Sequence, residues 1–513
     1  MFYVLSFDIL YFADTMRNIA LWFWGGMALV LACGLAIYFW PPSEARSVAA
    51  ALHVPATSSI LPATSVPATP RPPPLRYPAG SQIGTVDVGG LTTDEARVAL
   101  RQAYALHLAP LTLSGPGGSH IIKASDINLT LPLDSVLEDA AAGLTNTAAP
   151  LRLPFGPTYD PALLREAVAG LEAQIAFSPT LGYDPEAATF VLTPGLALDV
   201  DLTLAQITAT LETAPVSRQI ILATTPVTNS LQASPAELAA ALADRESRWG
   251  GVIGVSLYKL QTHESFHYHG DTVFSGMSVL KIPILLQTYI NRATFTRAQR
   301  NAIEAMIVES DNFASNELLA LIGDGDGLRG VRTMNNTLAD VLGVEFTTMA
   351  APFESITYLS KFEGIEIPAR GQEGAAPFTD ADPYVRATPN EMTKIVTAIV
   401  RCAADDGPLL DMTETKLTPL RCQEILKTLA LNQDTNKIVA GVPKDAFVAH
   451  KSGWIDDARA DSGYVQTADG DKYVISMWMW DSVEYIETAV SDPLLADISR
   501  IVYTAQHPVI VRR

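Results

Sequence analysis

The sequence predicts an α+β protein with two folded regions behind an apolar N-terminal segment. Strand-like and helix-like segments are interspersed through residues 81–229. Beyond residue 230, one helix and two strand patterns precede a run of helices, and three strand patterns and an amphipathic helix follow it. Capping boxes, in which a Ser or Thr stands three residues before a Glu or Gln, mark where several helices begin. This arrangement of strands and helices is typical of the α+β class.

The first feature along the chain is an apolar run at 19–40 without a charged residue. It is just long enough to cross a bilayer as a helix, and aromatic residues such as Trp22 and Trp40 stand near its ends, as interfacial anchors do. A cleaved signal peptide is the alternative, although its apolar run is normally shorter and ends in small residues. We therefore expect a short N-terminal segment at 1–18, a single-pass cell-membrane anchor at 19–40, and folded regions outside the cytoplasm.

Residues 41–80 are rich in Pro, Ala, Ser and Thr. Such a composition cannot bury a core, and it predicts a semi-extended linker. The formal net charge of −20 excludes a nucleic-acid partner, which would need a basic stripe.

The chain contains three cysteines, Cys33, Cys402 and Cys422. Their spacing does not fit a metal centre, so no metal site is predicted. Cys402 and Cys422 lie near the end and the start of two adjacent helical stretches. Outside the cytoplasm they can form a disulfide, but two free buried thiols fit the sequence nearly as well.

Residues 81–229 are predicted to form a small α+β domain. Capping boxes at Thr92 with Glu95 and at Thr203 with Gln206 predict helices at 94–104 and 204–211. A further helix is expected after Asp160, and strands are expected at 111–113, 190–192 and 220–222.

The segment 88–96, Val-Gly-Gly-Leu-Thr-Thr-Asp-Glu-Ala, resembles the opening of a peptidoglycan-binding domain of VanW-type proteins and some L,D-transpeptidases. The segment 190–195, followed by Asp199, resembles the closing strand of that domain. The resemblance spans most of 84–214 and implies a cell-wall-binding role. A spacer domain that positions the rest of the protein is the alternative.

Residues 230–513 are predicted to form a second, larger domain. A capping box at Ser234 predicts a helix to about residue 248, and strands are expected at 251–260 and 266–269. Helices are expected from 278 to about 323, followed by a long irregular stretch and a helix capped by Thr388. Three strands at 447–453, 462–467 and 473–480 and a helix at 483–504 complete the region.

Ser278 and Lys281 are the first candidate catalytic residues. At positions i and i+3 of one helix their side chains point the same way and can form a hydrogen bond. A serine hydroxyl needs a base, and lysine serves as one only when burial or neighbouring cations lower its pKa. The apolar residues at 279–286 around Lys281 fit that requirement. Ser278 at a helix start would have free N–H groups close to a developing oxyanion.

Two further motifs follow in order, Ser310-Asp311-Asn312 and Lys451-Ser452-Gly453. Lys451 stands in a strand pattern, where it can meet a substrate carboxylate, with Ser452 as a second donor. Gly453 would let the substrate backbone approach the strand. The next residue, Trp454, would supply its backbone N–H as half of an oxyanion hole, and the N–H of Ser278 would supply the other half.

The three motifs in this order resemble those of class A β-lactamases and penicillin-binding serine hydrolases. The resemblance covers about 235–510 and implies a five-stranded antiparallel sheet flanked by helices, with a helical subdomain. It also implies that Ser310 relays a proton to the leaving nitrogen and that Asn312 binds the acyl-amide side chain of the substrate.

The chain departs from that family in two places. The distance from Ser278 to Ser310 is short, and the Glu-x-x-Leu-Asn element that positions a deacylating glutamate is missing. Glu373, within the irregular segment 354–386, is a weak candidate for that glutamate. Acylation is therefore better supported than hydrolysis.

The sequence predicts an extracytoplasmic serine acyl hydrolase that opens β-lactam or related amide bonds through an acyl-Ser278 intermediate, without a cofactor. A peptidoglycan D,D-peptidase shares every motif and is the first alternative. A catalytically silent cell-wall-binding protein is the second.

Overall fold

The computed structural model describes residues 74–144, 149–213, 217–229, 231–354 and 374–511. The chain divides into two compact units at residue 73, and the described residues all belong to the second. The predicted anchor at 19–40 and most of the predicted linker at 41–80 lie outside them. Among the helices of the described ranges, none combines the length and apolar character that a bilayer crossing requires.

Residues 77–222 contain two clusters of buried apolar side chains. The first packs α2 (Thr93–Ala103) and α3 (Leu133–Leu144) against a small sheet of β2 (Val86–Asp87), β1 (Gln82–Ile83) and β5 (Arg152–Leu153). The second packs α4 (Pro161–Ala169), α5 (Glu172–Ile175) and α6 (Val200–Glu212) against β4 (Gly118–Ile122), β3 (Leu111–Gly115) and β9 (Gln219–Ile221). Strands β8 (Gly195–Leu198) and β10 (Thr224–Val227) form a separate antiparallel pair.

Two of the predicted helix starts in this region agree with the structure, and one does not. The Thr92–Glu95 capping box opens α2, and Asp160 caps α4. The predicted box at Thr203 is wrong, because α6 already begins at Val200 with Asp199 as its cap. Thr203 is buried inside the helix, where its hydroxyl accepts a hydrogen bond from the backbone N–H of Ala223. The Thr203 hydroxyl therefore bonds to a residue distant in the sequence and does not cap the helix, as the sequence had suggested.

A three-stranded sheet joins the N-terminal part of the described chain to its C-terminus. It consists of β6 (Thr180–Asp184), β7 (Thr189–Thr193) and β19 (Val509–Ile510), with β19 parallel to β7. Phe190 belongs to the same buried cluster as the final helix, and its N–H donates to the Thr504 hydroxyl at 3.0 Å.

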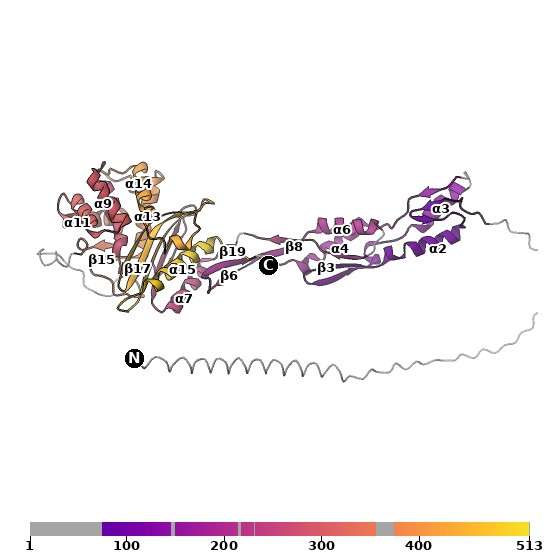
Figure 1. The fold of residues 1–513 in the computed structure, drawn as a ribbon, viewed down its shortest axis with the longest axis horizontal. Helices are drawn as coiled ribbons and strands as arrows, with labels where there is room; N and C mark the ends of the chain where they lie inside the picture. Colours follow the sequence, from indigo (N-terminus) through magenta and orange to yellow (C-terminus); the bar gives the residue numbers. More distant parts are fainter. Residues whose placement is uncertain (1–73, 145–148, 214–216, 230, 355–373, 512–513) are drawn as a thin grey trace, which may run out of the picture. The chain divides into compact units, whose positions relative to one another are not determined.

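The C-terminal region is built on a five-stranded antiparallel sheet (Figure 1). Its spatial order is β12 (Ser265–Tyr268), β11 (Val252–Lys259), β18 (Lys472–Trp480), β17 (Ala458–Gln466) and β16 (Phe447–Ile455). Side chains alternate between the two faces along each strand. On β18, Ile475 and Met477 pack into one buried cluster, and Val474 and Trp478 pack into the other. The sheet is therefore buried on both faces.

Helices cover both faces of this sheet. α7 (Pro235–Trp249) and α15 (Thr488–Gln506) pack on one face, and α13 (Pro389–Ala403) packs on the other. A helical subdomain lies on the α13 side and contains α8 (Lys281–Asn291), α9 (Arg297–Val308), α10 (Asn312–Ile322), α11 (Gly327–Leu342) and α14 (Pro419–Leu429). The short strands β13 (Phe274–Ser275), β15 (Val385–Ala387) and β14 (Thr348–Met349) form a small sheet of their own.

The prediction of irregular chain from 323 to 387 is wrong for α11. Asp326 caps this helix by accepting from two backbone N–H groups, and its apolar stripe, including Val331, Met334 and Leu338, is buried. The glycines at its start lower its intrinsic helix propensity, but packing of the buried stripe outweighs that cost. Gly330 is required there, because a Cβ would lie 1.9 Å from the Leu319 carbonyl oxygen of α10.

Cys402 and Cys422 form a disulfide between α13 and α14, with their Cα atoms 5.8 Å apart. The sequence left open a disulfide or two free thiols, and the structure has the disulfide. It closes a short loop, because the two residues are separated by 20 positions.

Replacing both bridged cysteines with serine is expected to lower the free energy of unfolding of the C-terminal region by about 3 kcal/mol, because the open chain gains entropy when it unfolds. Chemical denaturation of the variant and the parent protein measures this difference. Thiol titration of the denatured, unreduced parent should find one reactive thiol, and a result of three would contradict the bridge.

Candidate active site

The three sequence motifs meet where the helical subdomain adjoins the β16 edge of the five-stranded sheet. Ser278 lies in a 3₁₀ turn, η3 (Met277–Leu280), that leads directly into α8 at Lys281. Ser310 and Asn312 lie at the start of α10, where Asp311 caps the helix. Strand β16 carries Lys451 to Trp454 and contacts η3.

Lys281 is the centre of the hydrogen-bond network. Its residue surface is fully buried, and its Nζ lies 2.9 Å from Ser278 Oγ and 3.1 Å from Ser310 Oγ. Nζ also donates to Asn312 Oδ1 at 2.7 Å and to the Ser310 carbonyl at 2.6 Å. An ammonium group has only three hydrogens, so these four contacts cannot all be hydrogen bonds donated at once. In the contact with Ser278, the serine hydroxyl can instead donate a hydrogen bond to Lys281 when its amine is neutral.

The pKa of Lys281 is lowered to about 7, mainly by burial and also by the charge of Lys451, whereas Asp311 and Glu354 act in the opposite direction. A general base works best when its pKa is near the operating pH. Near neutrality, therefore, a large fraction of Lys281 is the free amine that can accept the proton of Ser278.

Both serines are associated with unusual backbone conformations. Met277, which precedes Ser278, has φ of 52°, and Ser310 has φ of 57°. Non-glycine residues with such values are uncommon and concentrate at functional sites. At Ser310 this conformation accompanies a geometry in which both the hydroxyl and the carbonyl reach Lys281 Nζ.

Strand β16 lies directly against Ser278. A Cβ on Gly453 would lie 3.0 Å from the Ser278 backbone nitrogen and 2.8 Å from Met277 Cβ, so any larger residue would push the strand away. Lys451 is buried, and its Nζ donates to the Ser452 carbonyl at 2.9 Å. Trp454 follows and is 66% exposed. The structure thus brings all the predicted motif residues into one region of the fold.

A buried set of charges supports Lys451 from behind β16. The pKa of Lys451 is lowered to about 8, mainly by burial; Asp461 and Asp434 oppose this shift, and Lys437 adds to it. His450 Nδ1 contacts the carboxylate of Asp461 at 2.8 Å, and both side chains are buried. His450 is therefore a buried group whose polar Nδ1 has a partner.

The sequence did not single out Phe353 and Glu354. The Phe353 ring centroid lies 4.9 Å from Lys281 Nζ, and the Phe353 backbone is held on both sides by the Asn316 amide, at 2.9 and 3.0 Å. Glu354 Oε1 accepts from Asn312 Nδ2 at 2.9 Å. Asn312 therefore links Lys281 to a carboxylate. The weak candidate Glu373 lies outside the described residues.

Acylation is expected to depend on pH through the pKa of Lys281. The neutral amine is the active form, so the rate should rise as the pH rises through about 7. Lys451→Ala removes a charge that lowers this pKa, so the midpoint should move to higher pH. Glu354→Gln removes a charge that raises it, so the midpoint should move to lower pH. Stopped-flow acylation rates across pH 5–10 measure both midpoints, and shifts in the same direction would contradict this assignment.

Comparison with known proteins agrees with this geometry. Residues 296–506 match the family model described as the beta-lactamase enzyme family. The matched span contains Ser310, Asn312 and 451–454, and it begins after Ser278 and Lys281. No curated protein gives a significant match to the chain.

Several solved structures are similar to about half of the chain. PBP-A is 20% identical, with 55% of this chain and 99% of that chain covered and a TM-score of 0.41. A PBP-A mutant in an acyl-enzyme complex with penicillin G is 20% identical, with coverage of 53% and 97% and a TM-score of 0.40. An ancestral class A β-lactamase, of the last common ancestor of Gram-negative bacteria, is 21% identical, with coverage of 52% and 99% and a TM-score of 0.39.

Residues 296–506 thus match a β-lactamase-family domain, and the C-terminal region that contains them has a β-lactamase/transpeptidase-like fold.

Proposed function

We propose that the C-terminal domain cleaves amide bonds through an acyl-Ser278 intermediate, with Lys281 as the base. The observation that carries this proposal is the 2.9 Å contact between Ser278 Oγ and a fully buried Lys281 whose pKa is lowered to about 7. In acylation, Lys281 Nζ accepts the proton of Ser278 while Oγ bonds to the carbonyl carbon. The C–N bond then breaks, and the leaving nitrogen receives a proton through the Ser310 hydroxyl.

The remaining motif residues bind and orient the substrate. The N–H groups of Ser278 and Trp454 stabilise the oxyanion, and Gly453 gives the substrate backbone access to β16. Lys451 and Ser452 bind a substrate carboxylate, and the Asn312 amide binds the acyl-amide group. Asn312 Nδ2 already donates to Glu354. A bound substrate would replace the Glu354 carboxylate as the acceptor of this hydrogen bond.

The substrate class that this site fits is an amide whose leaving side carries a carboxylate, as in β-lactams. A D,D-peptidase acting on stem-peptide-like substrates is the second candidate, and the position of Phe353 favours it. The Phe353 ring centroid lies 4.9 Å from Lys281 Nζ, and this apolar ring supplies no group that could activate a water for deacylation. A peptidase requires acylation by its own substrate, but it does not require fast release of a penicilloyl group.

We further propose that the protein is anchored in the cell membrane through 19–40, with the enzyme outside the cytoplasm. Residues 81–229 then either bind the cell wall or act as a spacer. The uncharged apolar run supports the anchor, and the resemblance at 88–96 supports the wall contact. Recovery of the full-length chain in the soluble fraction, or its protection from external protease in spheroplasts, would contradict the anchored topology.

Intact mass spectrometry after incubation with benzylpenicillin tests the proposed chemistry. The expected result is one added penicillin per chain, located on the peptide that contains Ser278. A chain that gains no adduct would match the silent wall-binding alternative. Parallel assays of nitrocefin hydrolysis and of D-alanine release from a peptide ending in D-Ala-D-Ala then separate the β-lactamase from the peptidase.

A further inference from the structure

Two aromatic side chains are exposed beside the end of β16 that adjoins the candidate active site. Trp454 is 66% exposed, and Tyr485, in the loop between β18 and α15, is 48% exposed. Exposed apolar surface of this kind often marks a site of interaction. Trp454 directly follows Gly453, the residue of β16 that approaches the Ser278 backbone, so its ring stands next to the reacting groups.

A buried arginine holds the two rings together. The Arg459 guanidinium carbon lies 5.8 Å from the centre of the Trp454 ring and 5.5 Å from that of the Tyr485 ring. At such distances a cation attracts an aromatic face. Arg459 is only 3% exposed, and its terminal nitrogens donate to the main-chain carbonyls of Ile455 and Ile486. One side chain therefore fixes the strand end, the loop and both rings.

The backbone that carries the rings is tied down as well. Ile486, the neighbour of Tyr485, is buried, and its N–H donates to the Asp456 carbonyl at 2.8 Å, in the turn between β16 and β17. The Trp480 indole donates to the Asp457 carboxylate of the same turn at 3.1 Å. Because the support is already ordered, a ligand that contacts the rings loses little affinity to ordering the protein.

The alternation of side chains along β16 places Trp454 on the same face as Ser452. Val448, also on this face, packs against the cluster beneath α7 and α15, whereas Ala449, on the other face, belongs to the cluster of the helical subdomain. Asn312, to which the acyl-amide group is assigned, lies in that subdomain. The rings therefore lie on the face of β16 where Ser452 is assigned to the substrate carboxylate, which is the leaving-group side.

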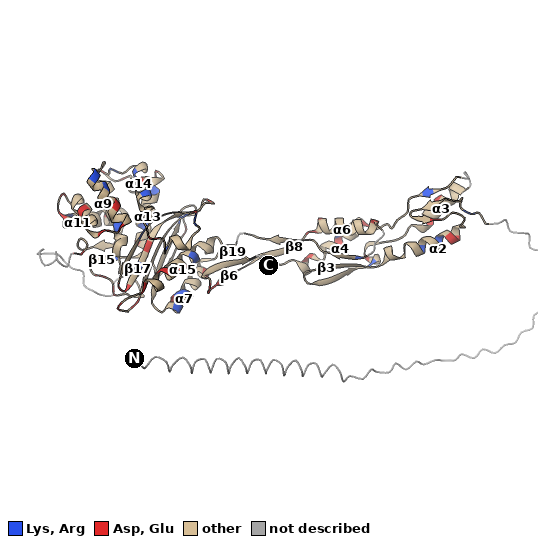
Figure 2. Ribbon diagram, viewed as in Figure 1, with Lys and Arg blue, Asp and Glu red and all other residues tan. Residues whose placement is uncertain are grey.

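The charges near the rings limit what they can bind. Acidic residues are distributed along the described chain (Figure 2), and two of them, Asp456 and Glu484, are exposed in the segments that carry the rings. Their carboxylates disfavour a second anionic group at this position. An uncharged ring avoids that repulsion and can stack on an aromatic face.

We propose that Trp454 and Tyr485 form a stacking surface for a flat, uncharged ring on the leaving-group side of the substrate. The ring contacts the exposed aromatic surface while the neighbouring carboxylate of the substrate binds Lys451 and Ser452. A substrate with a small aliphatic group at this position lacks the contact. The proposal rests on the proposed acyl-Ser278 function, because it takes the orientation of the substrate from that site.

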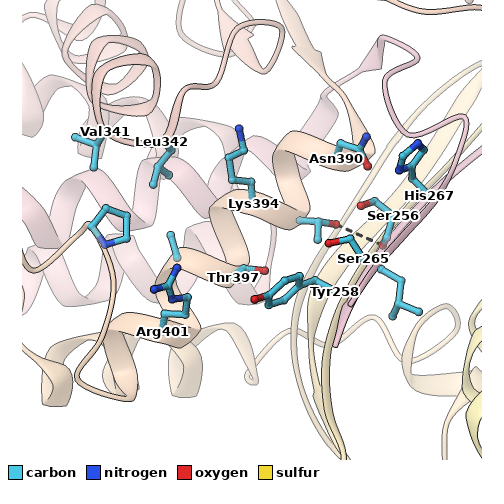
Figure 3. Close-up of a pocket in the computed structure, with 14 residues that line it drawn as sticks. Ser256, Tyr258, Ser265, His267, Val341, Leu342, Asn390, Lys394, Thr397 and Arg401 are labelled. Carbon is cyan, nitrogen blue, oxygen red and sulfur yellow. Dashed lines mark hydrogen bonds between the residues drawn. The ribbon is translucent and has the colours of Figure 1, made fainter. Parts of the chain in front are cut away.

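Another tyrosine lines a surface depression, but it lies far from the proposed surface. Tyr258 is on the depression beside α13 (Figure 3), and its hydroxyl contacts His263 Nδ1 at 2.9 Å. It belongs to β11, which β18 and β17 separate from β16 in the sheet. At the usual spacing of strands the distance between β11 and β16 is roughly 14 Å. Tyr258 is therefore a suitable control.

Equilibrium dialysis of the full-length Ser278→Ala protein tests the proposal, because it measures binding without acylation. Nitrocefin and cephalothin share a thienylacetyl group, but on the leaving side nitrocefin has a dinitrostyryl ring and cephalothin has an acetoxymethyl group. We expect nitrocefin to bind at least about tenfold more tightly. Trp454→Leu and Tyr485→Leu, each added to Ser278→Ala, should reduce this preference about fivefold, because leucine is apolar but has no flat face.

Two aromatic residues outside the surface provide matched controls. Phe447, at the other end of β16, is 40% exposed, so Phe447→Leu and Tyr258→Leu should both leave the nitrocefin preference unchanged. Unchanged thermal midpoints show that the variants are folded. Equal binding of the two β-lactams by the Ser278→Ala protein would overturn the proposal, and so would an unchanged preference in both Trp454→Leu and Tyr485→Leu.

Cephacetrile separates the two sides of the substrate. It has the acetoxymethyl group of cephalothin and a cyanoacetyl group in place of the thienylacetyl group. Its affinity relative to cephalothin should not respond to Tyr485→Leu. If that ratio changes as much as the nitrocefin preference does, the rings serve the acyl side and the proposal is wrong.

Intact mass of the protein with Ser278 in place reports on the acyl-enzyme function separately. An adduct on Ser278, together with a nitrocefin preference that does not depend on the rings, would refute this proposal alone. A preference that depends on the rings, without any adduct, would refute the acyl-enzyme chemistry alone.

Discussion

Ser278→Ala is expected to abolish covalent labelling by penicillins, and Lys281→Ala is expected to slow labelling about 10²–10⁴-fold, the usual contribution of a positioned base. Ser278 is the hydroxyl at the start of the α8 segment, against the Gly453 backbone of β16. Lys281 Nζ is 2.9 Å from its Oγ. Burst amplitudes and rates with a fluorescent penicillin, followed by intact mass, measure both effects.

Lys281→Arg separates the role of a base from that of a positive charge. Arginine keeps its proton at every pH of interest, so this variant should be about as slow as Lys281→Ala if proton acceptance is what matters. Acylation of Lys281→Arg at the parental rate would show that the charge alone suffices. Labelling of Ser278→Ala would identify another nucleophile, and the Ser310 hydroxyl, 3.1 Å from Lys281 Nζ, would be the first to test.

The motif residues could be found in the sequence because each motif is a local pattern. Ser278 and Lys281 are one turn apart, and Lys451 to Trp454 occupy consecutive positions in a strand pattern. Alternation of apolar residues likewise predicted the five strands of the main sheet to within a few residues, except that β17 begins earlier than expected, at Ala458. These features need no knowledge of distant contacts.

Phe353 and Glu354 could not be found in this way. Their positions depend on the Asn316 amide, which holds the Phe353 backbone from a helix 37 residues earlier in the chain. No local pattern around 353 specifies that contact. Helix α11 was missed for a related reason, because its weak local propensity is overcome by burial of its apolar stripe against the subdomain.

Phe353→Glu is expected to speed deacylation of the penicilloyl-enzyme by about 10²–10⁴-fold, the contribution of a general base that activates water. In the parent protein, the Phe353 ring lies 4.9 Å from Lys281 Nζ and fills the space beside the reacting groups. A carboxylate at this position, with its backbone fixed by Asn316, would lie next to the acyl-ester. Time-resolved intact mass after removal of free penicillin measures the lifetime of the adduct.

Two controls make this result interpretable. Phe353→Leu stays apolar and should leave the adduct long-lived, so that faster release cannot be attributed to loss of the ring alone. Glu354→Gln tests the existing carboxylate, which binds the Asn312 amide at an exposed position, and we expect it to change the lifetime of the adduct little.

The carboxylate of Phe353→Glu should also affect acylation. An anion beside Lys281 opposes the burial that holds its pKa near 7, so the acylation midpoint should move to higher pH while deacylation accelerates. Near neutral pH, this one substitution would therefore slow acylation and speed deacylation. If the parent protein instead hydrolyses nitrocefin rapidly without a detectable adduct, a base already activates the deacylating water. Loss of that turnover in Glu354→Gln would assign this role to Glu354, and its persistence would direct the search to Glu373.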